Sequence, residues 1–331
     1  MPERRSGPDL PTTILVTGGA GFIGSHVCDA LLAQGHAVRC MDNLATGNLG
    51  NIAHLQGMEG FTFLPGDIRD AATVHGAMEG ATAVVHLAAL GSVPRSITFP
   101  LDSEGVNLAG FLHILEAARE LGVKRITYAS SSSVYGDSTL LPKREGSEGS
   151  PLSPYAVSKA MDEAYAALYH RLYGLETIGL RFFNIFGERQ DPEGAYAAAI
   201  PRFMRALLRH ESPVINGDGA QTRDFTYVGN AVQAVQRGLE APAQLAGQVF
   251  NIACGERCNL LDLLGRIRSR LATIDPAIAH LQPQHGPERA GDVRDSLADI
   301  SKAREQLGYR PRFSLDEGLD RAVPWYAENW R

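Results

Sequence analysis

The sequence predicts an α/β protein with a Rossmann-type, doubly wound parallel sheet and a smaller C-terminal lobe. Apolar strand-like runs alternate with amphipathic helical stretches through the first half of the chain. A glycine-rich turn joins the first run to the first helix, and the alternation loosens after about residue 184. At 331 residues the chain also exceeds the usual size of a single core, so we expect two lobes.

The strand-like runs are rich in β-branched residues, and the helical stretches end near glycines such as Gly35. Ser153 and Pro154 are both good helix-initiating residues, so they mark the start of a long helix. The expected strands are 12–19, 36–43, 61–67, 83–90, 124–131 and 176–183, and the expected helices are 26–35, 71–80, 107–122 and 153–172.

The expected division follows the change in pattern. Residues 1–12 are expected to form a flexible tail, and residues 13–183 a dinucleotide-binding domain. Residues 184–225 and 254–331 are richer in Pro and Gly and are expected to form the second lobe. The segment 226–253 is expected to return in part to the first lobe. Ligands of such parallel sheets bind beyond the carboxyl ends of the strands, so the site is expected there.

Composition excludes several classes of function. The net charge is −6, and the sequence shows no cluster of basic residues of the kind that nucleic-acid binding requires. No apolar run approaches the ~20 residues of a membrane-spanning helix, and the start lacks the apolar core of a secretory signal. The four cysteines, two of them in ACGERC, have no partners at zinc spacing, so we expect reduced thiols, no metal and a cytoplasmic location.

A dinucleotide site is indicated by VTGGAGFIGSH. Gly18, Gly21 and Gly24 follow one another at three-residue intervals between a strand and a helix. The first permits a tight turn, the second lets backbone approach a pyrophosphate, and the third allows close packing of helix on strand. Asp42 ends the second strand, where a carboxylate accepts hydrogen bonds from a ribose and repels the 2′-phosphate of NADP. NAD is therefore the predicted cofactor. Asp67, after the third strand, is either an adenine contact or the N-cap of the next helix.

A tyrosine and a lysine in SPYAVSK are the predicted acid–base pair. Tyr155 and Lys159 are four residues apart, so they share one face of a helix. An ammonium beside a phenol favours the phenolate, which suits Tyr155 to act as a general base. The Y-x-x-x-K pattern alone is common on helix surfaces, and the glycine turn upstream makes it specific.

These motifs together resemble those of the extended short-chain dehydrogenase/reductases, in the branch of nucleotide-sugar epimerases and dehydratases. The resemblance runs from about Thr13 to the C-terminus. It rests on TGGAGFIGSH, Asp42, GDIRD, HLAAL, SSSSVYG, SPYAVSK, LRFFNIFG, GDGAQTRDFTYV and ERAGDVRDSLADISKA. The stretches LAALGSVPRSI, FGERQDPEGAYAAAIP and GDVRDSLADISKA bring it nearest to the UDP-N-acetylglucosamine 4-epimerases.

The resemblance implies site residues. Asn184 would hold the nucleotide-sugar, Arg223 and Arg289 would bind the diphosphate with their planar guanidinium groups, and Asp292 would bind the uridine ribose. In isolation each arginine would be read as a surface ion pair. The implied cofactor residues are Gly18, Gly21, Phe22, Ile23, Gly24, Asp42, Asn43, Gly47, Asp67, Ile68, Leu87, Ala88, Ala89, Tyr155 and Lys159, and Gly91, Ser92, Ser132, Asn184, Gln190, Ala198, Arg223, Arg289, Asp292 and Ser296 are the implied substrate residues.

The serines of ITYASSSSVYG could form a polar loop or supply active-site hydroxyls. In the family, the strand before VYG delivers a hydroxyl to the sugar 4-oxygen, which implies Ser131 and Ser132 as catalytic residues beside Tyr155 and Lys159. Related 4,6-dehydratases have an acidic pair among the positions of Ser131, Ser132 and Ser133, so dehydration is not expected. Which serine is essential stays open, because adjacent hydroxyls can substitute for each other.

Ser296 is the predicted specificity residue. In glucose-restricted 4-epimerases a tyrosine stands at this position, and a serine leaves room for an N-acetyl group. The alternative is that Ser296 permits acetamido sugars without preferring them. The implied reaction is 4-epimerisation of a UDP-hexose by transient oxidation at C4 with NAD that stays bound.

Two other functions remain open, a decarboxylase or other enzyme of UDP-uronic acids and a non-catalytic NAD-binding scaffold. A homodimer is implied as well, through a four-helix bundle of residues 107–121 and 155–173. The apolar positions consistent with that pairing, or equally with an ordinary core, are Leu108, Phe111, Leu112, Leu115, Ala164, Ala167 and Leu168.

Overall fold

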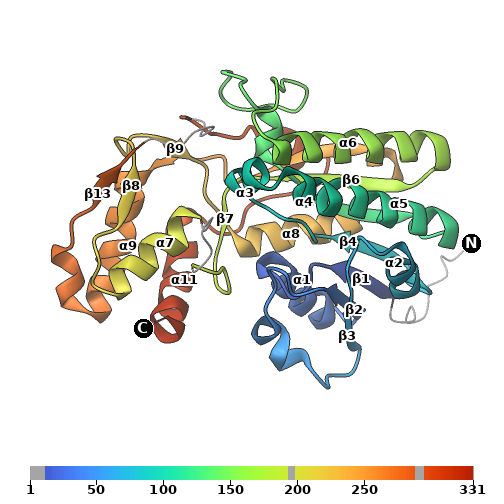
Figure 1. Cartoon of the computed structure of the whole chain (residues 1–331), viewed down its shortest axis with the longest axis horizontal. Helices are drawn as coiled ribbons and strands as arrows, with labels where there is room; N and C mark the ends of the chain where they lie inside the picture. The colour runs from blue at the N-terminus through green and yellow to red at the C-terminus, as the bar shows by residue number, and fades with distance from the viewer. Residues whose placement is uncertain (1–11, 193–197, 288–293, 331) are drawn as a thin grey trace, which may run out of the picture.

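A seven-stranded parallel sheet forms the centre of the protein in a computed structural model that describes residues 12–192, 198–287 and 294–330 (Figure 1). Every pair of neighbouring strands runs parallel. The predicted Rossmann-type fold class is thereby confirmed. The strands lie in the order β11 (Gln248–Ile252), β6 (Glu176–Phe182), β5 (Arg125–Ser131), β4 (Ala83–His86), β1 (Thr13–Thr17), β2 (Ala37–Asp42) and β3 (Phe61–Pro65).

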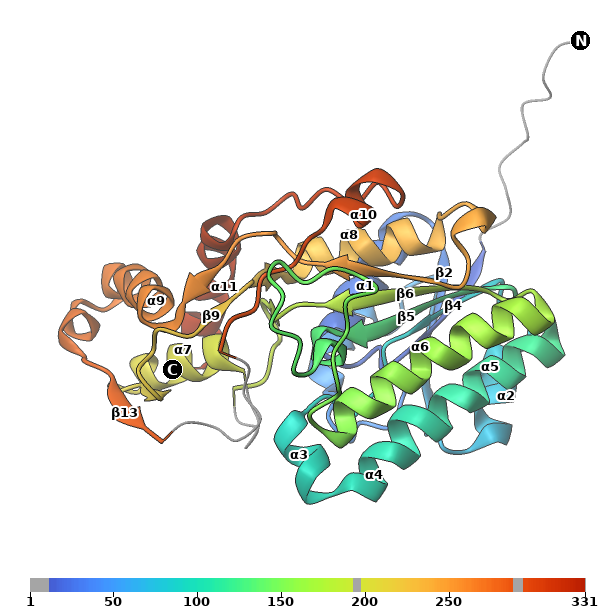
Figure 2. The same cartoon turned by 90° about the horizontal axis from the view of Figure 1, so that it is seen from above.

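Helices cover both faces of this sheet. Figure 2 shows α1 (Phe22–Ala33) and α8 (Val228–Leu239) on one face. The other face is covered by α2 (Ala71–Met78), α5 (Gly110–Leu121) and α6 (Pro154–Tyr173). Buried apolar side chains on each face give the sheet two cores, which is why its central strands read as continuous apolar runs.

The order of the strands fixes where a ligand can bind. The chain moves outward from β1 through β2 to β3 and then returns to place β4 on the other side of β1. The two directions diverge at the carboxyl ends of β1 and β4, which leaves a crevice there. Thr17, Asp42, His86 and Ser131 end four strands on this side of the sheet. The polar motifs of the sequence therefore meet at one edge.

The first turns of α6 and α5 show how local sequence determines where a helix begins and how it is wound. Helix α6 begins as expected, because the Ser153 hydroxyl accepts a hydrogen bond from Ala156 N at 3.1 Å and Pro154 follows it. The expected helix 107–122 differs in its first turn, since residues Gly105–Ala109 form a π-helix before α5 begins. Asn107 explains this difference: its buried side chain accepts a hydrogen bond from Leu90 N at 2.7 Å, which holds the widened turn against the loop after β4.

The second lobe lies beside the carboxyl edge of the sheet (Figure 1). It contains α7 (Ala199–Leu208), α9 (Leu260–Ile274) and α11 (Leu315–Asn329). Among the described residues of this lobe there are also three two-stranded sheets: β7 (Ile185–Phe186) with β10 (Thr226–Tyr227), β8 (Val214–Asn216) with β13 (Gln284–Gly286), and β9 (Thr222–Arg223) with β12 (Cys258–Asn259). None of the described helices is long and apolar enough to cross a membrane. Residues 1–11 of the expected tail lie outside the described residues.

Candidate active site

A groove of about 490 Å³ lies at the crevice between β1 and β4. It collects most of the predicted cofactor residues from four separate segments of the chain. Those lining it are Gly18, Gly21, Phe22, Ile23, Gly24, Asp42, Asn43, Ile68, Leu87, Ala88 and Ala89, together with Gly91. Gly91, predicted as a substrate residue, therefore lies on the cofactor side.

The turn at the start of α1 fits a dinucleotide. Gly18 has a φ of +70°, and a Cβ there would lie 2.6 Å from Ala88 N. A Cβ on Gly24 would lie 2.1 Å from Gly18 O, so helix and turn pack too closely for any side chain. Gly21, the N-cap residue of α1, offers no side chain to the first-turn amides, which leaves them available for a phosphate.

Asp42 is fixed by the backbone around the turn. Its Oδ2 accepts a hydrogen bond from Ala20 N at 3.0 Å, and its Oδ1 accepts one from Leu44 N at 2.8 Å. Burial raises the pKa of Asp42, and these amide donors oppose that shift. A Cβ on Gly47 would lie 2.8 Å from Oδ1, so Gly47 contributes by leaving space for this carboxylate.

Asp67, two residues after the end of β3, is held by Arg69. Arg69 Nη2 donates to Asp67 Oδ2 at 2.7 Å, and Asn43 Nδ2 donates to the same oxygen at 2.9 Å. The hydrogen bonds from Arg69 hold the pKa of Asp67 well below its usual range. The N-cap of α2 is Asp70, whose side chain accepts from Ala72 N, so the alternative N-cap role of Asp67 is wrong.

Tyr155 and Lys159 lie on consecutive turns of α6. Tyr155 N donates to Ser96 Oγ at 3.1 Å, which ties the first turn of α6 to α3 (Val93–Thr98). Lys159 is only 2% exposed, and its ammonium donates to Ala129 O on β5 at 3.0 Å. Burial alone would lower the pKa of Lys159, but the neighbouring Asp162 carboxylate and Tyr155 raise it above its ordinary value.

The four serines have separate partners. Ser130 Oγ donates to Glu163 Oε1 at 2.5 Å and is committed to the protein interior. Ser131 Oγ accepts from Ser133 N at 3.1 Å and so caps the short helix Ser132–Tyr135. Ser131, Ser132 and Ser133 line a pocket beside Tyr155, and the buried Ser133 Oγ has no hydrogen-bond partner among the described residues. The first serine therefore belongs to the core and the next three to the pocket.

This pocket, of about 240 Å³, is the candidate sugar site. It brings the serines and Tyr155 together with Asn184, Arg223 and Ser296, all predicted from the sequence. Its described lining contains no carboxylate. The remaining residues that line it were not predicted, namely Val93, Tyr135, Gly136, Lys143, Leu152, Ser153 and Ala156.

A second pocket continues from the sugar site under α7. Asn184 and Arg223 line both pockets, and Ala198, also predicted as a substrate residue, lines the second. Asn184 has a φ of +40° and donates through Nδ2 to Asp224 O at 3.2 Å. Two connected pockets joined by an arginine fit a sugar and a nucleoside on either side of a diphosphate.

Two predicted substrate residues are engaged elsewhere, and two lie outside the described residues. The Ser92 hydroxyl accepts from Arg95 N at 3.1 Å as the N-cap of α3. Gln190 Nε2 donates to Ile185 O at 3.1 Å, so its amide braces the loop after β7. Neither is among the residues that line the two pockets. Arg289 and Asp292 fall in the segment 288–293, outside the described residues.

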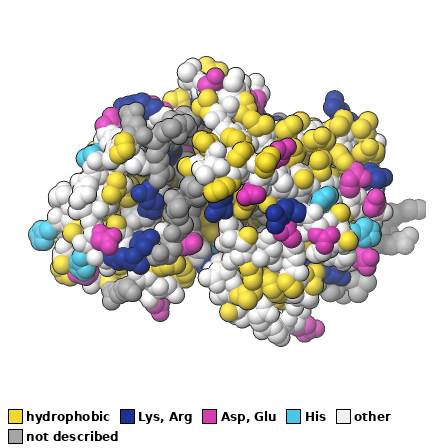
Figure 3. Space-filling model, in the orientation of Figure 1, with side chains coloured by type: hydrophobic (Ala, Val, Ile, Leu, Met, Phe, Trp, Pro, Cys, Tyr) yellow, Lys and Arg dark blue, Asp and Glu magenta, His cyan; other side chains and the backbone are white. Residues whose placement is uncertain are grey.

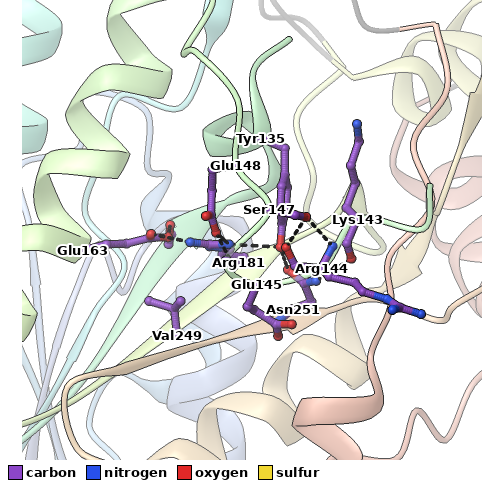
Figure 4. Close-up of polar contacts among 12 residues, drawn as sticks. Tyr135, Lys143, Arg144, Glu145, Ser147, Glu148, Glu163, Arg181, Val249 and Asn251 are labelled. Carbon is purple, nitrogen blue, oxygen red and sulfur yellow. Dashed lines mark hydrogen bonds and ion pairs between the residues drawn. The ribbon is translucent and has the colours of Figure 1, made fainter. Parts of the chain in front are cut away.

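A buried polar network secures the strap, which we define as residues 137–152, between the serines and α6 (Figure 4). Arg181 on β6 donates to both oxygens of Glu163 at 2.8 and 2.7 Å and to Tyr135 Oη at 3.0 Å. It also pairs with Glu148 of the strap. Lys143 N donates to Leu297 O at 2.7 Å, so the strap contacts the C-terminal segment next to Ser296. The network thus holds two walls of the sugar pocket together.

The fold and site define a class, dinucleotide-binding enzymes of the Rossmann type with a tyrosine–lysine pair. Residues 14–253 match the NAD dependent epimerase/dehydratase family, and the chain belongs to that family. Its cofactor is accordingly NAD, and the glycine turn fits this group.

Individual relatives span nearly the whole chain. The UDP-glucose 4-epimerase of Mycolicibacterium smegmatis is 38% identical over 94% of this chain and 97% of its own length. A structure of UDP-N-acetylglucosamine 4-epimerase from Methanobrevibacter ruminantium M1 in complex with UDP-N-acetylmuramic acid superposes with a TM-score of 0.89, 36% identity and coverage of 96% of this chain and 99% of that one. The UDP-glucose 4-epimerase of Thermus thermophilus, solved in complex with NAD, gives 0.84 and 33% identity, covering 96% of this chain and 100% of that one.

Proposed function

We propose that this protein is an NAD-dependent 4-epimerase that interconverts UDP-N-acetylglucosamine and UDP-N-acetylgalactosamine, with UDP-glucose and UDP-galactose as a second substrate pair. The observation that carries this proposal is the lining of the sugar pocket. Ser296 lines this pocket together with Tyr155 and the serines, and a small side chain at this wall leaves space for an acetamido group. One relative of known structure, 36% identical to this chain, is a UDP-N-acetylglucosamine 4-epimerase.

The residues divide the chemistry as follows. Tyr155 removes the proton of the sugar 4-hydroxyl, directly or through the hydroxyl of Ser131 or Ser132, and returns it at the end of the cycle. When bound, NAD⁺ would supply the acceptor for the hydride from C4 and, once reduced, the donor for its return. Lys159 keeps its ammonium beside the phenol and orients the ribose of the cofactor. The 4-keto sugar turns about its diphosphate, which Arg223 holds, and presents its other face.

The pocket chemistry argues against elimination of water from the sugar. A dehydratase needs an acid and a base beside C5 and C6, whereas the described pocket lining supplies hydroxyls, one amide and the two cations Lys143 and Arg223. The cation at Lys143 favours the second candidate function, epimerisation of a UDP-uronic acid, because an ammonium at the wall suits a carboxylate. That candidate ranks second, since Lys143 Nζ is already engaged by Ser138 O.

The test uses purified protein without added cofactor. It is incubated separately with UDP-N-acetylglucosamine, UDP-glucose and UDP-glucuronic acid, and the products are resolved by chromatography. Conversion of the acetamido sugar to its 4-epimer is expected, because the cofactor stays bound through turnover. Conversion of the uronic acid alone, or of none of the three, contradicts the proposal.

A homodimer is part of the proposal, with α6 as its centre. Val157 and Met161 are each 43% exposed, and Ala164 and Leu168 continue the same face at helical spacing. Figure 3 shows hydrophobic side chains gathered where α5 and α6 lie.

Phe111 and Leu115, two of the positions predicted for this pairing, are instead fully buried against the sheet, so α6 supplies the larger part of the surface. Sedimentation of wild type and Met161→Glu tests it, and a wild-type monomer contradicts it.

A further inference from the structure

Lys159 of the tyrosine–lysine pair forms a buried ion pair with an acidic residue of its own helix. Its Nζ lies 3.1 Å from Asp162 Oδ2, one turn further along α6. Lys159 is 2% exposed and Asp162 is 0% exposed. The ammonium has three protons, and Ala129 O and Asp162 account for two of them. One donor therefore remains for the phenol and the cofactor.

Asp162 has no other strong partner among the described residues. Its Oδ1 accepts no hydrogen bond from any of them. The adjacent Glu163 points to Arg181 and Ser130 instead, as Figure 4 shows for Arg181, so its charge is compensated separately. Each of the two neighbouring carboxylates thus has its own cation.

The other titratable groups around this pair are neutral or compensated. Tyr128 on β5 is buried, which raises its pKa far above its ordinary value and keeps it protonated. Burial lowers the pKa of His86 on β4 to about 3, so this imidazole is neutral. Burial raises the pKa of Asp162 itself to about 6, against the opposing effect of Lys159. Near neutral pH the local charge is therefore set by Lys159, Asp162 and Tyr155.

Removing the carboxylate would change the energy of the phenolate. With Asp162 ionised, the buried group is neutral overall, and loss of the tyrosine proton leaves one uncompensated negative charge. Without it, the same proton loss converts a net positive group into a neutral one, which a buried site favours. The proton then leaves the tyrosine–lysine pair at lower pH, whichever of the two residues loses it.

We propose that Asp162 is a positioning residue for the catalytic lysine: it fixes the Lys159 ammonium against β5 and sets the pH at which Tyr155 becomes competent as a base. The proposal rests on the proposed function insofar as it takes Tyr155 as the base. Asp162 touches neither substrate nor cofactor in this role. It acts through Lys159 alone.

The test compares the pH profiles of wild type and Asp162→Asn, purified with their cofactor. The acid limb of kcat should move by about 1 pH unit to lower pH in the variant, because one adjacent charge has been removed. Glu120→Gln, which removes a carboxylate from the exposed end of α5, should leave the limb in place. A uniform loss of kcat with an unmoved acid limb would mean a merely structural role and would overturn the proposal.

A second measurement does not depend on turnover. The tyrosinate absorbance of the resting holoenzyme is titrated, and the same titration of Tyr155→Phe is subtracted. The tyrosinate absorbance that remains after this subtraction should appear at lower pH in Asp162→Asn than in wild type. Coincident titration curves for the two proteins would overturn the proposal even if no UDP-sugar is converted. If the asparagine variant does not fold, Asp162→Ser removes the same charge with a smaller side chain.

Discussion

The phenol of Tyr135 donates a hydrogen bond to Asn251 Oδ1 at 2.7 Å and thereby joins the turn after the serines to the outermost strand, β11. Asn251 in turn donates through Nδ2 to Lys143 O and Asp299 O, both at 3.0 Å. One buried amide thus connects the sheet, the strap and the C-terminal segment that carries Ser296. The shape of the sugar pocket depends on this junction.

Tyr135→Phe should destabilise this junction without touching the acid–base pair. The substitution removes the donor to Asn251 and leaves Arg181 without one acceptor, at a cost of about 1–3 kcal/mol in the free energy of unfolding. KM for the UDP-sugar should rise more than kcat falls. Urea unfolding and steady-state kinetics check this, with the exposed Tyr173→Phe as control. Equal stability of the two variants would contradict the role assigned to the junction.

How far the sequence predicts this site depends on how local each feature is. The glycine turn and the tyrosine–lysine pair each lie within a few consecutive residues, so their spacing alone places the residues. The serines also lie in one run, but only the fold reveals that Ser130 points to Glu163 and the others to the pocket. A run of identical side chains carries no information on which of them are already bonded.

Features built from distant segments were missed. Lys143 reaches the sugar pocket because the strap pairs with residues near Ala298, and nothing in LPKRE indicates that pairing. Asp162 lies three residues from Lys159, yet an acid on a helix is usually solvated, so its burial could not be foreseen. Ser92, predicted as a substrate residue, caps α3, and a serine before V-P-R-S is also an N-cap signal.

Gly24→Ala should abolish cofactor retention. Its Cβ would lie 2.1 Å from Gly18 O, a contact that the turn can relieve only by shifting the backbone that faces the pyrophosphate. The purified variant should contain less than about a tenth of the wild-type NAD, measured after denaturation, because a bound phosphate loses its amide donors. Gly76→Ala, on the exposed side of α2 with open space around it, is the matched control and should retain NAD. Full occupancy in Gly24→Ala would show that the turn does not hold the cofactor.

Asp224→Asn should loosen the packing of separate chain segments within the second lobe. The carboxylate of Asp224 accepts from Cys254 N and Gly255 N at 3.1 Å and from Ala298 N at 3.3 Å. An asparagine amide would turn an NH₂ group toward one of these donors, so the free energy of unfolding should fall by about 1–3 kcal/mol. Thermal unfolding measures the loss, and Asp218→Asn, at an exposed turn, is the control. An unchanged unfolding midpoint would contradict this account.

Tyr155→Phe should lower kcat by about 10²–10⁴-fold, the range of a general base, while NAD stays bound. The phenylalanine keeps the ring in place and removes only the ionisable oxygen. Ser131→Ala and Ser132→Ala, made separately, should each cost less than the tyrosine change if either hydroxyl can relay the proton. Product chromatography gives the rates, and NAD content shows that each variant is loaded. Substantial turnover by Tyr155→Phe would remove this residue from the mechanism.

Ser296→Tyr tests the specificity of the sugar pocket most directly. Ser296 N donates to Thr222 O at 3.1 Å, so the backbone at this position is fixed and a larger side chain must project into the pocket. An acetamido group would compete with the phenol ring for that space, whereas a hydroxyl would not. The ratio of kcat/KM for UDP-N-acetylglucosamine to that for UDP-glucose should therefore fall by about 10- to 100-fold, equivalent to the ~1–3 kcal/mol of an overpacked site. Ser296→Ala, which keeps the space, should leave the ratio within about twofold. If Ser296→Tyr lowers both values equally, the pocket wall formed by Ser296 does not contact the substituent at C2, and the preference for acetamido sugars must be sought at another wall.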